Sequence, residues 1–292
     1  MLINQETLKG IYQSFKTIFN QTLENTDTYW EKVATRVPSS TKTNNYGWLG
    51  AFPNLREWIG ERQVKNLTAS GYSITNKSFE ATIALDRDDI EDDNLGVYKP
   101  VIQELARAAK AHPDELVFGE LFLKGTSLKC YDGKPFFSDQ HKIGKNTYSN
   151  YQDGTGPAWF LLDTSRALKP FIVQIRKNPE FVSKDSPDDY NVFTRKEFLY
   201  GVDYRGNVGY GFWQMAFMSK AELNAENYKS ARIAMSKIKN EYGRPLAIRP
   251  TLLVVGPSNE EPARILLNSE QISGSTNIWR NSAQLLVVPY LD

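Results

Sequence analysis

The sequence predicts an α+β fold in which one long amphipathic helix packs against β-sheet. Three observations lead to this prediction. Apolar residues recur at three- and four-residue steps from Val97 to Ala109, which is the period of a helix with one buried face. Apolar and polar residues alternate from Phe79 to Leu85, which is the period of a strand. After residue 158, short strand-like runs alternate with a second helical pattern.

The composition is that of a globular protein. The chain has 292 residues, of which 40% are hydrophobic, enough for one large domain or two smaller ones. The formal net charge of +1 is spread without long basic runs, which argues against an electrostatic grip on nucleic acid or on an anionic membrane. Cys130 is the only cysteine, so we expect folding in a reducing compartment. We expect no membrane span and no export signal, because no window is apolar enough.

Residues 1–38 are expected to form an N-terminal arm with one short helix. Leu8, Ile11, Phe15 and Phe19 give a weak helical pattern, which is broken before Val37-Pro38. These apolar positions are too few to close a core of their own, so the segment is predicted to be an arm and not a domain.

An aromatic segment, Tyr46–Gly60, follows the arm. Its large side chains are interleaved with glycine and proline, so they are held on a backbone that turns repeatedly. Two interpretations remain open from the residues alone. The segment either packs irregularly onto the core of its own chain, or it projects as a loop and buries these rings against a neighbouring subunit. The side chains concerned are Trp48, Phe52, Trp58 and Ile59.

A β-hairpin is predicted next, with its turn near Asn76-Lys77. Tyr72 and Ile74 alternate with polar residues before this turn, and Phe79 to Leu85 alternate after it. The hairpin is sparsely apolar, so little of it is expected to be core.

The long helix is predicted to start near Asn94, where Asp92 and its neighbours can cap the first amides. Its far end depends on Pro113, which lacks the N–H that an inner helical residue donates. The helix either stops near Ala111 after roughly 27 Å, or continues with a kink to Leu123 over about 45 Å. A third alternative places the proline in the first turn of a second helix.

The second half of the sequence is predicted to form a mixture of helices and strands. A second helix is expected over Ala221–Tyr242, and Ser258 with Glu261 has the spacing of a capping box ahead of another helix. Residues 177–190 are polar and are predicted to be turn-rich. Glycines between residues 201 and 211 are predicted to mark strands that meet at turns. The predicted strands are Trp159–Leu162, Phe171–Ile175, Phe198–Tyr204, Arg249–Val255 and Gln284–Pro289.

Candidate chemical sites in the sequence are weak, and we predict no enzyme, cofactor or metal. Cys130, Asp139 and His141 suggest thiol catalysis, but the chain has only two histidines and shows no oxyanion hole. The acidic run Asp86–Asp93 lacks the spacing of a calcium loop and is better explained as a helix start. The segment VGPSNEE has no GK[ST], and its two acids would repel phosphate.

The order of an arm, a loop, a long helix and a mixed remainder resembles the major capsid proteins of tailed phages with the Hong Kong 97-type fold. Six phrases, in the same order, are similar to the major head subunit gpT of Mu-like phages and prophages. They run from the start of the chain to its end and are YGWLGAFPNLREWIGER, NKSFEATIALDRDDIEDDNLGVYKP, AHPDELVFGELF, CYDGKPFFSDQH, LYGVDYRGNVGYGFWQMAF and PTLLVVGPSNEEPARILL.

This resemblance implies five segments. They are an N-arm over 1–38, an extended β-hairpin loop over 39–86, a peripheral domain with the spine helix over 87–157, an axial domain over 158–270, and a strand over 271–292 that returns to the peripheral sheet. It also favours the interface interpretation of Trp48, Phe52, Trp58 and Ile59. Finally, it implies a further short aromatic segment at the C-terminus, which this chain, ending at Asp292, does not carry.

The implied function is structural. Many copies would form hexamers and pentamers of an icosahedral head, made in the bacterial cytoplasm and present in the virion. The resemblance implies a scaffold protein and a portal as partners, with double-stranded DNA enclosed and not specifically bound. Two alternatives stay open: a shell or ring protein of a phage-like particle without DNA, and a hydrolase that uses Cys130 and His141.

Overall fold

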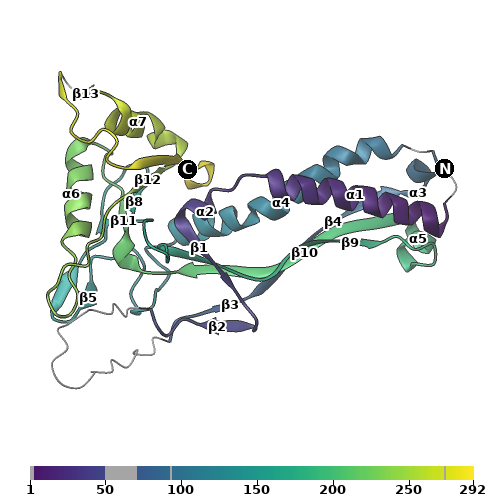
Figure 1. Ribbon diagram of the computed structural model, residues 1–292, viewed down its shortest axis with the longest axis horizontal. Helices are drawn as coiled ribbons and strands as arrows, with labels where there is room; N and C mark the ends of the chain where they lie inside the picture. Colours follow the sequence, from purple (N-terminus) through teal and green to yellow (C-terminus); the bar gives the residue numbers. More distant parts are fainter. Residues whose placement is uncertain (1–2, 50–70, 93, 273) are drawn as a thin grey trace.

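The structure, a computed structural model, describes residues 3–49, 71–92, 94–272 and 274–292. It has an elongated body in which two long helices lie over a sheet, and a second body at one end of it that contains α6 and α7 (Figure 1). The N-terminus lies at the far end of the elongated body, and the C-terminus lies where the two bodies meet (Figure 1). The chain is therefore α+β, as predicted.

The sheet of the elongated body has four strands in the order β1-β9-β10-β4. β1 is parallel to β9, and β10 is antiparallel to both β9 and β4. Helices α1 and α4 lie side by side over this sheet (Figure 1). The strands are β1 (Ala34–Pro38), β4 (Lys77–Asp86), β9 (Phe171–Lys184) and β10 (Glu197–Tyr210), and the helices are α1 (Gln5–Asn25) and α4 (Lys99–Asp114).

Helix α1 is longer than the arm prediction allowed, at 21 residues. It starts with a capping box, in which Asn4 Oδ1 accepts from Thr7 N at 2.9 Å and Thr7 Oγ1 accepts from Asn4 N at 3.1 Å. Its stripe of apolar residues, which includes Phe15 and Phe19, is buried in one core with α4 and β10. The segment lacks a core of its own, but α4 and the sheet provide one. A short helix α2 (Trp30–Val33) then leads into β1.

The acidic run forms helix α3 (Arg87–Glu91), as the helix-start interpretation predicted. Asp86 caps this helix by accepting a hydrogen bond from Asp88 N at 2.8 Å. A 3₁₀ turn, η1 (Leu95–Tyr98), then precedes α4.

The long helix continues through Pro113, which rules out both a stop near Ala111 and a separate second α-helix. α4 passes directly into η2 (Glu115–Phe122), which has π-helical hydrogen bonding. Pro113 cannot donate to the carbonyl four residues back, and a wider turn accommodates this missing bond. The change of helix type also separates two cores, because Ile102 to Ala109 belong to one core and Val117 to Phe122 belong to the other.

The predicted hairpin around Asn76-Lys77 is wrong. β3 (Ser73–Thr75) pairs with β2 (Thr43–Asn45), whereas β4 pairs with β10 in the four-stranded sheet. Asn76 lies between the two sheets, and its buried side-chain amide donates to Ser39 Oγ and to Thr41 O. The hairpin of the extended loop is therefore formed by β2 and β3.

Strands β9 and β10 are 14 residues each, much longer than the predicted runs. The polar segment after residue 177 continues β9 as far as Lys184 because one side of the strand faces solvent, so the turn-rich prediction is wrong for residues 177–184. It is confirmed for residues 185–189, which form coil and a turn. Pro179 fits because the register shifts beside it, between Asp203 and Arg205. The glycines of β10 do not mark turns either. A Cβ on Gly206 would lie 2.6 Å from Gln174 O, so this glycine allows close approach of β9.

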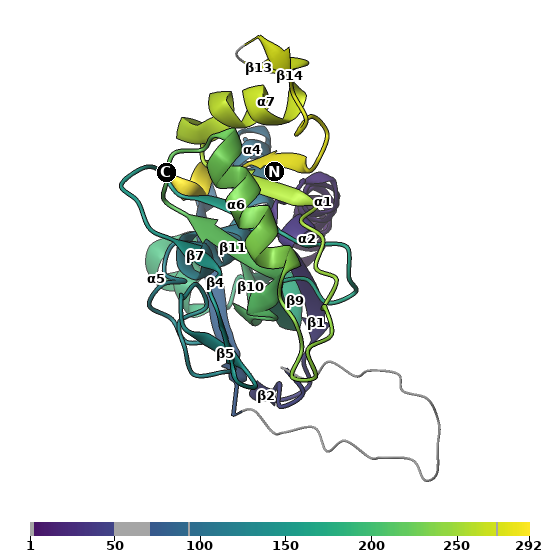
Figure 2. The same cartoon turned by 90° about the vertical axis from the view of Figure 1, so that its left-hand side faces the viewer.

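The second body contains a five-stranded sheet in the order β15-β12-β8-β11-β7. β8, β11 and β12 are completely buried. α6 lies across one face of this sheet, and α7 packs against β12 and β15 (Figure 2). The strands are β7 (Tyr151–Gln152), β8 (Trp159–Leu162), β11 (Ala216–Ser219), β12 (Leu252–Val255) and β15 (Gln284–Val287), and the helices are α6 (Ala225–Ser236) and α7 (Glu260–Asn268).

Two predictions for the C-terminal part are corrected. β15 pairs with β12, so the last strand does not return to the four-stranded sheet. Ser258 does not form a capping box, because a 3₁₀ turn, η4 (Pro257–Asn259), precedes α7, and Ser258 N donates to Asp292 Oδ2 at 2.7 Å. The remaining short elements are α5 (Tyr190–Arg195), β5 (His141–Ile143), β6 (Asn146–Tyr148), β13 (Gln271–Ile272), β14 (Ser275–Thr276), η3 (Trp213–Met215) and η5 (Pro289–Leu291).

Candidate assembly surfaces

Trp48 lies at the base of the extended loop, on a row of aromatic rings. Its ring centroid is 6.3 Å from that of Tyr46 and 6.2 Å from that of Phe212. Trp48 is 40% exposed, whereas Tyr46 is buried. The indole therefore packs partly on its own chain, and the exposed part is open to contact. Phe52, Trp58 and Ile59, the other predicted interface residues, lie outside the described residues.

Buried polar groups fix the two ends of this loop to the four-stranded sheet. Tyr46 OH donates to Gln174 Oε1 at 2.8 Å, and Gln174 Nε2 donates to Asn76 Oδ1 at 2.7 Å. On the return side, Tyr72 OH accepts from Tyr210 N at 2.6 Å. Burial raises the pKa of both Tyr46 and Tyr72 to about 12, so both hydroxyls stay neutral. Because buried polar groups are costly when unpaired, these bonds determine where the loop leaves the sheet.

Large apolar side chains are exposed at the extremities of the molecule. On α5, at the end of the elongated body far from α6, Tyr190 is 79% and Phe193 is 86% exposed. In the second body, Tyr242 after α6 and Ile278 after β14 are also exposed. Aromatic and aliphatic groups that project from element ends are typical of contact surfaces between proteins. Sequence reasoning missed the α5 pair. Tyr190 was the last residue of the segment predicted to be turn-rich, and Phe193 lay in no predicted element.

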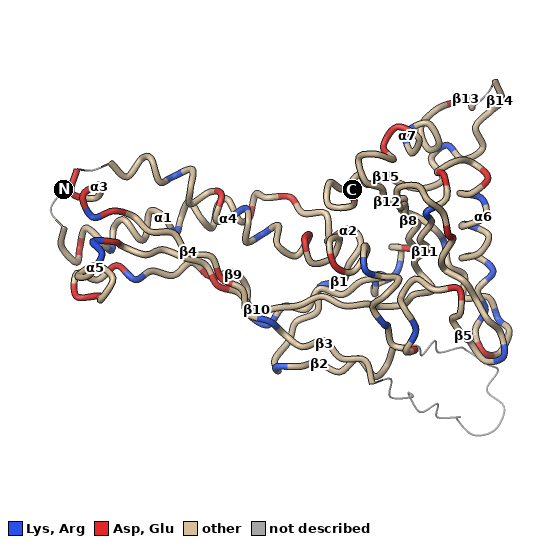
Figure 3. The backbone as a smooth tube through the Cα atoms, turned by 180° about the vertical axis from the view of Figure 1, so that it is seen from behind, with Lys and Arg blue, Asp and Glu red and all other residues tan. Residues whose placement is uncertain are grey.

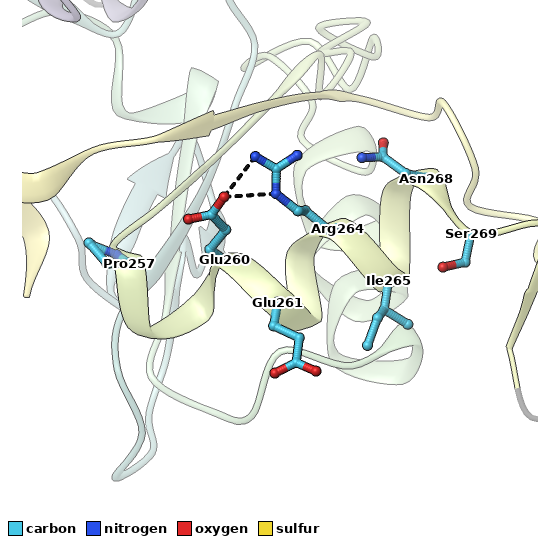
Figure 4. A pocket seen from close by; sticks show the side chains of 7 residues that line it. All are labelled: Pro257, Glu260, Glu261, Arg264, Ile265, Asn268 and Ser269. Carbon is cyan, nitrogen blue, oxygen red and sulfur yellow. Dashed lines mark hydrogen bonds and ion pairs between the residues drawn. The ribbon is translucent and has the colours of Figure 1, made fainter.

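A shallow hollow of about 740 Å³ lies along α7 (Figure 4). Arg264 bridges to Glu260 at 2.7 Å on one side of the helix, whereas Ile265, 44% exposed, points to the other side with Glu261. The lining residues are Pro257, Glu260, Glu261, Arg264, Ile265, Asn268 and Ser269. They form no nucleophile–base pair, so the hollow has the character of a contact surface and not of an active site.

Charges of both signs are interspersed over the described part of the chain (Figure 3). Several of them neutralise each other locally, as in Lys177 with Asp203 at 2.8 Å and Arg280 with Glu270 at 2.9 Å. This pattern does not resemble the basic stripe of a nucleic-acid-binding surface. Among the described residues, no helix is long and apolar enough to cross a membrane.

The suspected thiol site has a different third member from the one that the sequence suggested. Asp132, and not the exposed Asp139, lies between the two other groups: its Oδ2 is 2.6 Å from His141 Nδ1, and its Oδ1 accepts from Cys130 Sγ at 3.2 Å. Burial raises the pKa of the Cys130 thiol well above its usual value, so thiolate is scarce and the group is a poor nucleophile. Burial is the largest single influence on Asp132 and would raise its pKa, but the hydrogen bond and charge of His141, with the hydrogen bonds from Lys134 N and Cys130, together lower the pKa.

The spine helix over a long sheet, the extended loop and the second body together define a capsid subunit of the Hong Kong 97-type fold. The comparisons give the family. The chain belongs to the Mu-like prophage major head subunit gpT family, whose model matches residues 8–291. It is a major capsid protein of the phage head, and its relatives are structural proteins and not enzymes.

Two relatives match over nearly the whole chain. The major capsid protein of Escherichia phage Mu is 40% identical over 311 residues, with 100% of both chains covered. The Mu-like prophage FluMu major head subunit of Haemophilus influenzae is 41% identical, with 99% of both covered.

Solved capsids give the same result. The subunit in the procapsid of bacteriophage JBD30 matches with a TM-score of 0.89 and 44% identity, covering 99% of this chain and 100% of that one. The subunit in the JBD30 capsid matches with a TM-score of 0.81 and 34% identity, covering 100% of both. This chain is therefore a shell-forming subunit.

Proposed function

We propose that copies of this chain assemble into the hexamers and pentamers of an icosahedral head that encloses double-stranded DNA, with a scaffold protein and a portal as partners. The similarity of the whole chain to the JBD30 procapsid subunit supports this proposal most strongly. The mixed surface charge suits DNA that is confined by the shell, with mobile cations present, and not bound by a basic face.

The proposed subunit has an N-arm over 1–38, an extended loop over 39–86, a peripheral domain that starts at residue 87 and an axial domain within 158–270. β9 and β10 lie in the four-stranded sheet under the spine helix, so we assign these two strands to the peripheral domain and not to the axial domain that was predicted over 158–270. The remaining segment, 271–292, adds β15 to the sheet of the second body. We assign the main subunit contacts to the arm, to the loop with Trp48, Phe52, Trp58 and Ile59, and to the loops of the axial domain. Each contact is modest, and closed symmetry multiplies them.

Exposed apolar groups support this assignment. Trp48 is 40% exposed at the base of the loop, and the α5 pair projects from the far end of the elongated body. A monomer would have no use for such side chains in water, whereas a neighbouring copy can cover them.

Negative-stain microscopy of the purified protein, with light scattering at low and high concentration, tests the proposal. We expect capsomer rings, tubes or closed shells, with the scattering mass rising with concentration. A single species of about 33 kDa at every concentration, with and without a co-expressed scaffold, would contradict it.

A further inference from the structure

Cys130, Asp132 and His141 form a cluster that the assembly proposal does not use. Their side chains offer one sulfur, one oxygen and one nitrogen, all within 4.8 Å of one another. Cys130 and Asp132 lie in a tight turn whose Gly133 has a positive φ of 76°, and His141 is the first residue of β5. The side chain of His141 is completely buried, and that of Asp132 is 18% exposed, so the cluster is enclosed but has one route to solvent.

The hydrogen bonds of His141 restrict what its Nδ1 atom can contact. Nε2 lies 3.2 Å from the carbonyl oxygen of Phe136, and because a carbonyl only accepts, Nε2 carries a hydrogen. Nδ1 lies 2.6 Å from Asp132 Oδ2. An ionised carboxylate, like a carbonyl, accepts hydrogen bonds and cannot donate them. Two lone pairs at this distance repel each other. A hydrogen therefore lies between these two atoms at this distance, and a metal ion that binds both of them can take its place once they move apart.

We propose that Cys130, Asp132 and His141 bind a divalent cation of the zinc class. Zn²⁺ takes thiolate, imidazole and carboxylate ligands in a tetrahedron, and water can complete a site with three protein ligands. The bond from Nε2 to the Phe136 carbonyl is the partner that a metal-ligating histidine usually has. Mg²⁺ and Ca²⁺, which prefer oxygen ligands only, do not suit this set.

Binding requires only small changes. The cation replaces the proton on Cys130 Sγ and the proton on His141 Nδ1, and both protons pass to solvent without any change of oxidation state. With metal–ligand distances of about 2.0–2.2 Å, the Asp132 oxygen and the His141 nitrogen move apart to roughly 3.3 Å. Asp132 can make this movement because it is the partly exposed member of the three.

The proposed ion would fasten the 130–141 segment to the core of the second body. The His141 ring stacks on Trp213 at 4.0 Å, with 6° between the planes, and Trp213 is almost completely buried. A bond to His141 therefore ties the tight turn at Cys130 and Asp132 to this ring pair.

Cobalt titration of the metal-stripped wild-type chain tests the proposal. Co²⁺ bound to a thiolate gives a charge-transfer absorption band, and because Cys130 is the only cysteine, the band reports this site alone. We expect the band to saturate at one equivalent and to disappear when Zn²⁺ is added. With free Zn²⁺ at 100 times the Kd, the melting temperature should rise by about 5 °C.

Two variants separate this site from other metal binding. Cys130→Ser keeps a hydroxyl that can donate to Asp132, and we expect it to abolish the band and to weaken zinc binding at least 10-fold. His112→Gln removes the only other histidine and should change neither. The absence of a thiolate band in the wild-type protein would overturn the proposal whether or not a variant folds. Full zinc stabilisation in Cys130→Ser would also overturn it.

Discussion

At the scale of single residues, the packing of Trp48 within its own subunit can be separated from its predicted contact with a neighbouring subunit. The indole contacts Tyr46 and Phe212 but remains 40% exposed, so it contributes little core and much contact surface. The sequence predicted an interface for this ring, and that assignment stays a prediction. Chemistry at Asp132 was not predicted, because the sequence suggested Asp139 as the acidic partner of Cys130 and His141. No local pattern reveals that His141 lies against it.

The variant Trp48→Ala with Trp58→Ala should keep the subunit folded and weaken assembly. We expect a melting temperature within a few degrees of wild type, because Trp48 is already 40% exposed and its loss removes less buried area than the loss of a core tryptophan. Light scattering and microscopy should show fewer or no shells. Trp159→Ala is the matched control, since Trp159 is completely buried and its loss should cost about 3–5 kcal/mol of unfolding free energy. Unfolding of the double variant as severe as in this control would place both rings in the core.

Asp114 predicts a pH dependence of subunit stability. Its buried carboxylate accepts from Trp30 N at 2.6 Å and from Tyr29 N at 3.0 Å, yet burial dominates and raises its pKa to about 6. Because the folded-state pKa lies above the unfolded value, Asp114 favours folding most below pH 4. That contribution disappears as the pH rises through about 6.

Denaturant unfolding of wild type and Asp114→Asn at pH 4.5 and pH 7.5 measures this effect. The stability of wild type relative to the variant should rise by roughly 1–3 kcal/mol at the lower pH. Other acids titrate equally in both proteins and cancel in the difference. A difference that is independent of pH, or that has the opposite sign, would show that the carboxylate is not destabilised by burial.

At the scale of elements, local periodicity correctly predicted the helices and strands whose signal lies within their own residues. The helix of α4 and the buried run of β8 were confirmed because each contains its own signal. The buried stripe of α4 is shifted from the predicted one, however, since Ile102 and Ala106 are buried whereas Val97 and Val101 are exposed. The length of β9 was missed because its outer half is polar on one side and contains Pro179, which only the register shift makes compatible with a strand. The pairing of β4 with β10 was missed because strand alternation does not identify a partner.

Two Gly→Ala variants test where the structure requires a residue without a side chain. Gly206→Ala should destabilise the subunit by about 1–3 kcal/mol, because the new Cβ would meet Gln174 O of β9 at 2.6 Å. Gly10→Ala, in the interior of α1 with nothing within 4 Å, should stabilise it by about 0.5–1 kcal/mol. Denaturant unfolding of each variant measures these changes in the free energy of unfolding. Equal effects of the two changes would mean that Gly206 of β10 does not pack closely against Gln174 O of β9.

At the scale of the whole molecule, the dispersed charges predict weak contact with DNA. Filter binding or fluorescence anisotropy with double-stranded DNA and the unassembled subunit should give only weak binding at physiological salt. The slope of log K against log salt should be shallow, since few phosphates are neutralised. Tight binding with a steep salt slope would mean that the described surface does not represent the DNA contact. The basic candidates would then lie outside the described residues.

The pairing of β1 with β9 has a consequence for how the chain is made. Ala34 lies opposite Phe171, and the stripe of α1 is covered by residues as late as Val202. Synthesis runs from the N-terminus, so the ribosome releases α1 and β1 long before the strands that complete their sheet. The growing chain therefore carries an uncovered apolar helix and an open strand edge for most of its synthesis. The subunit is most exposed to wrong association at this stage, in a cell that makes many copies at once.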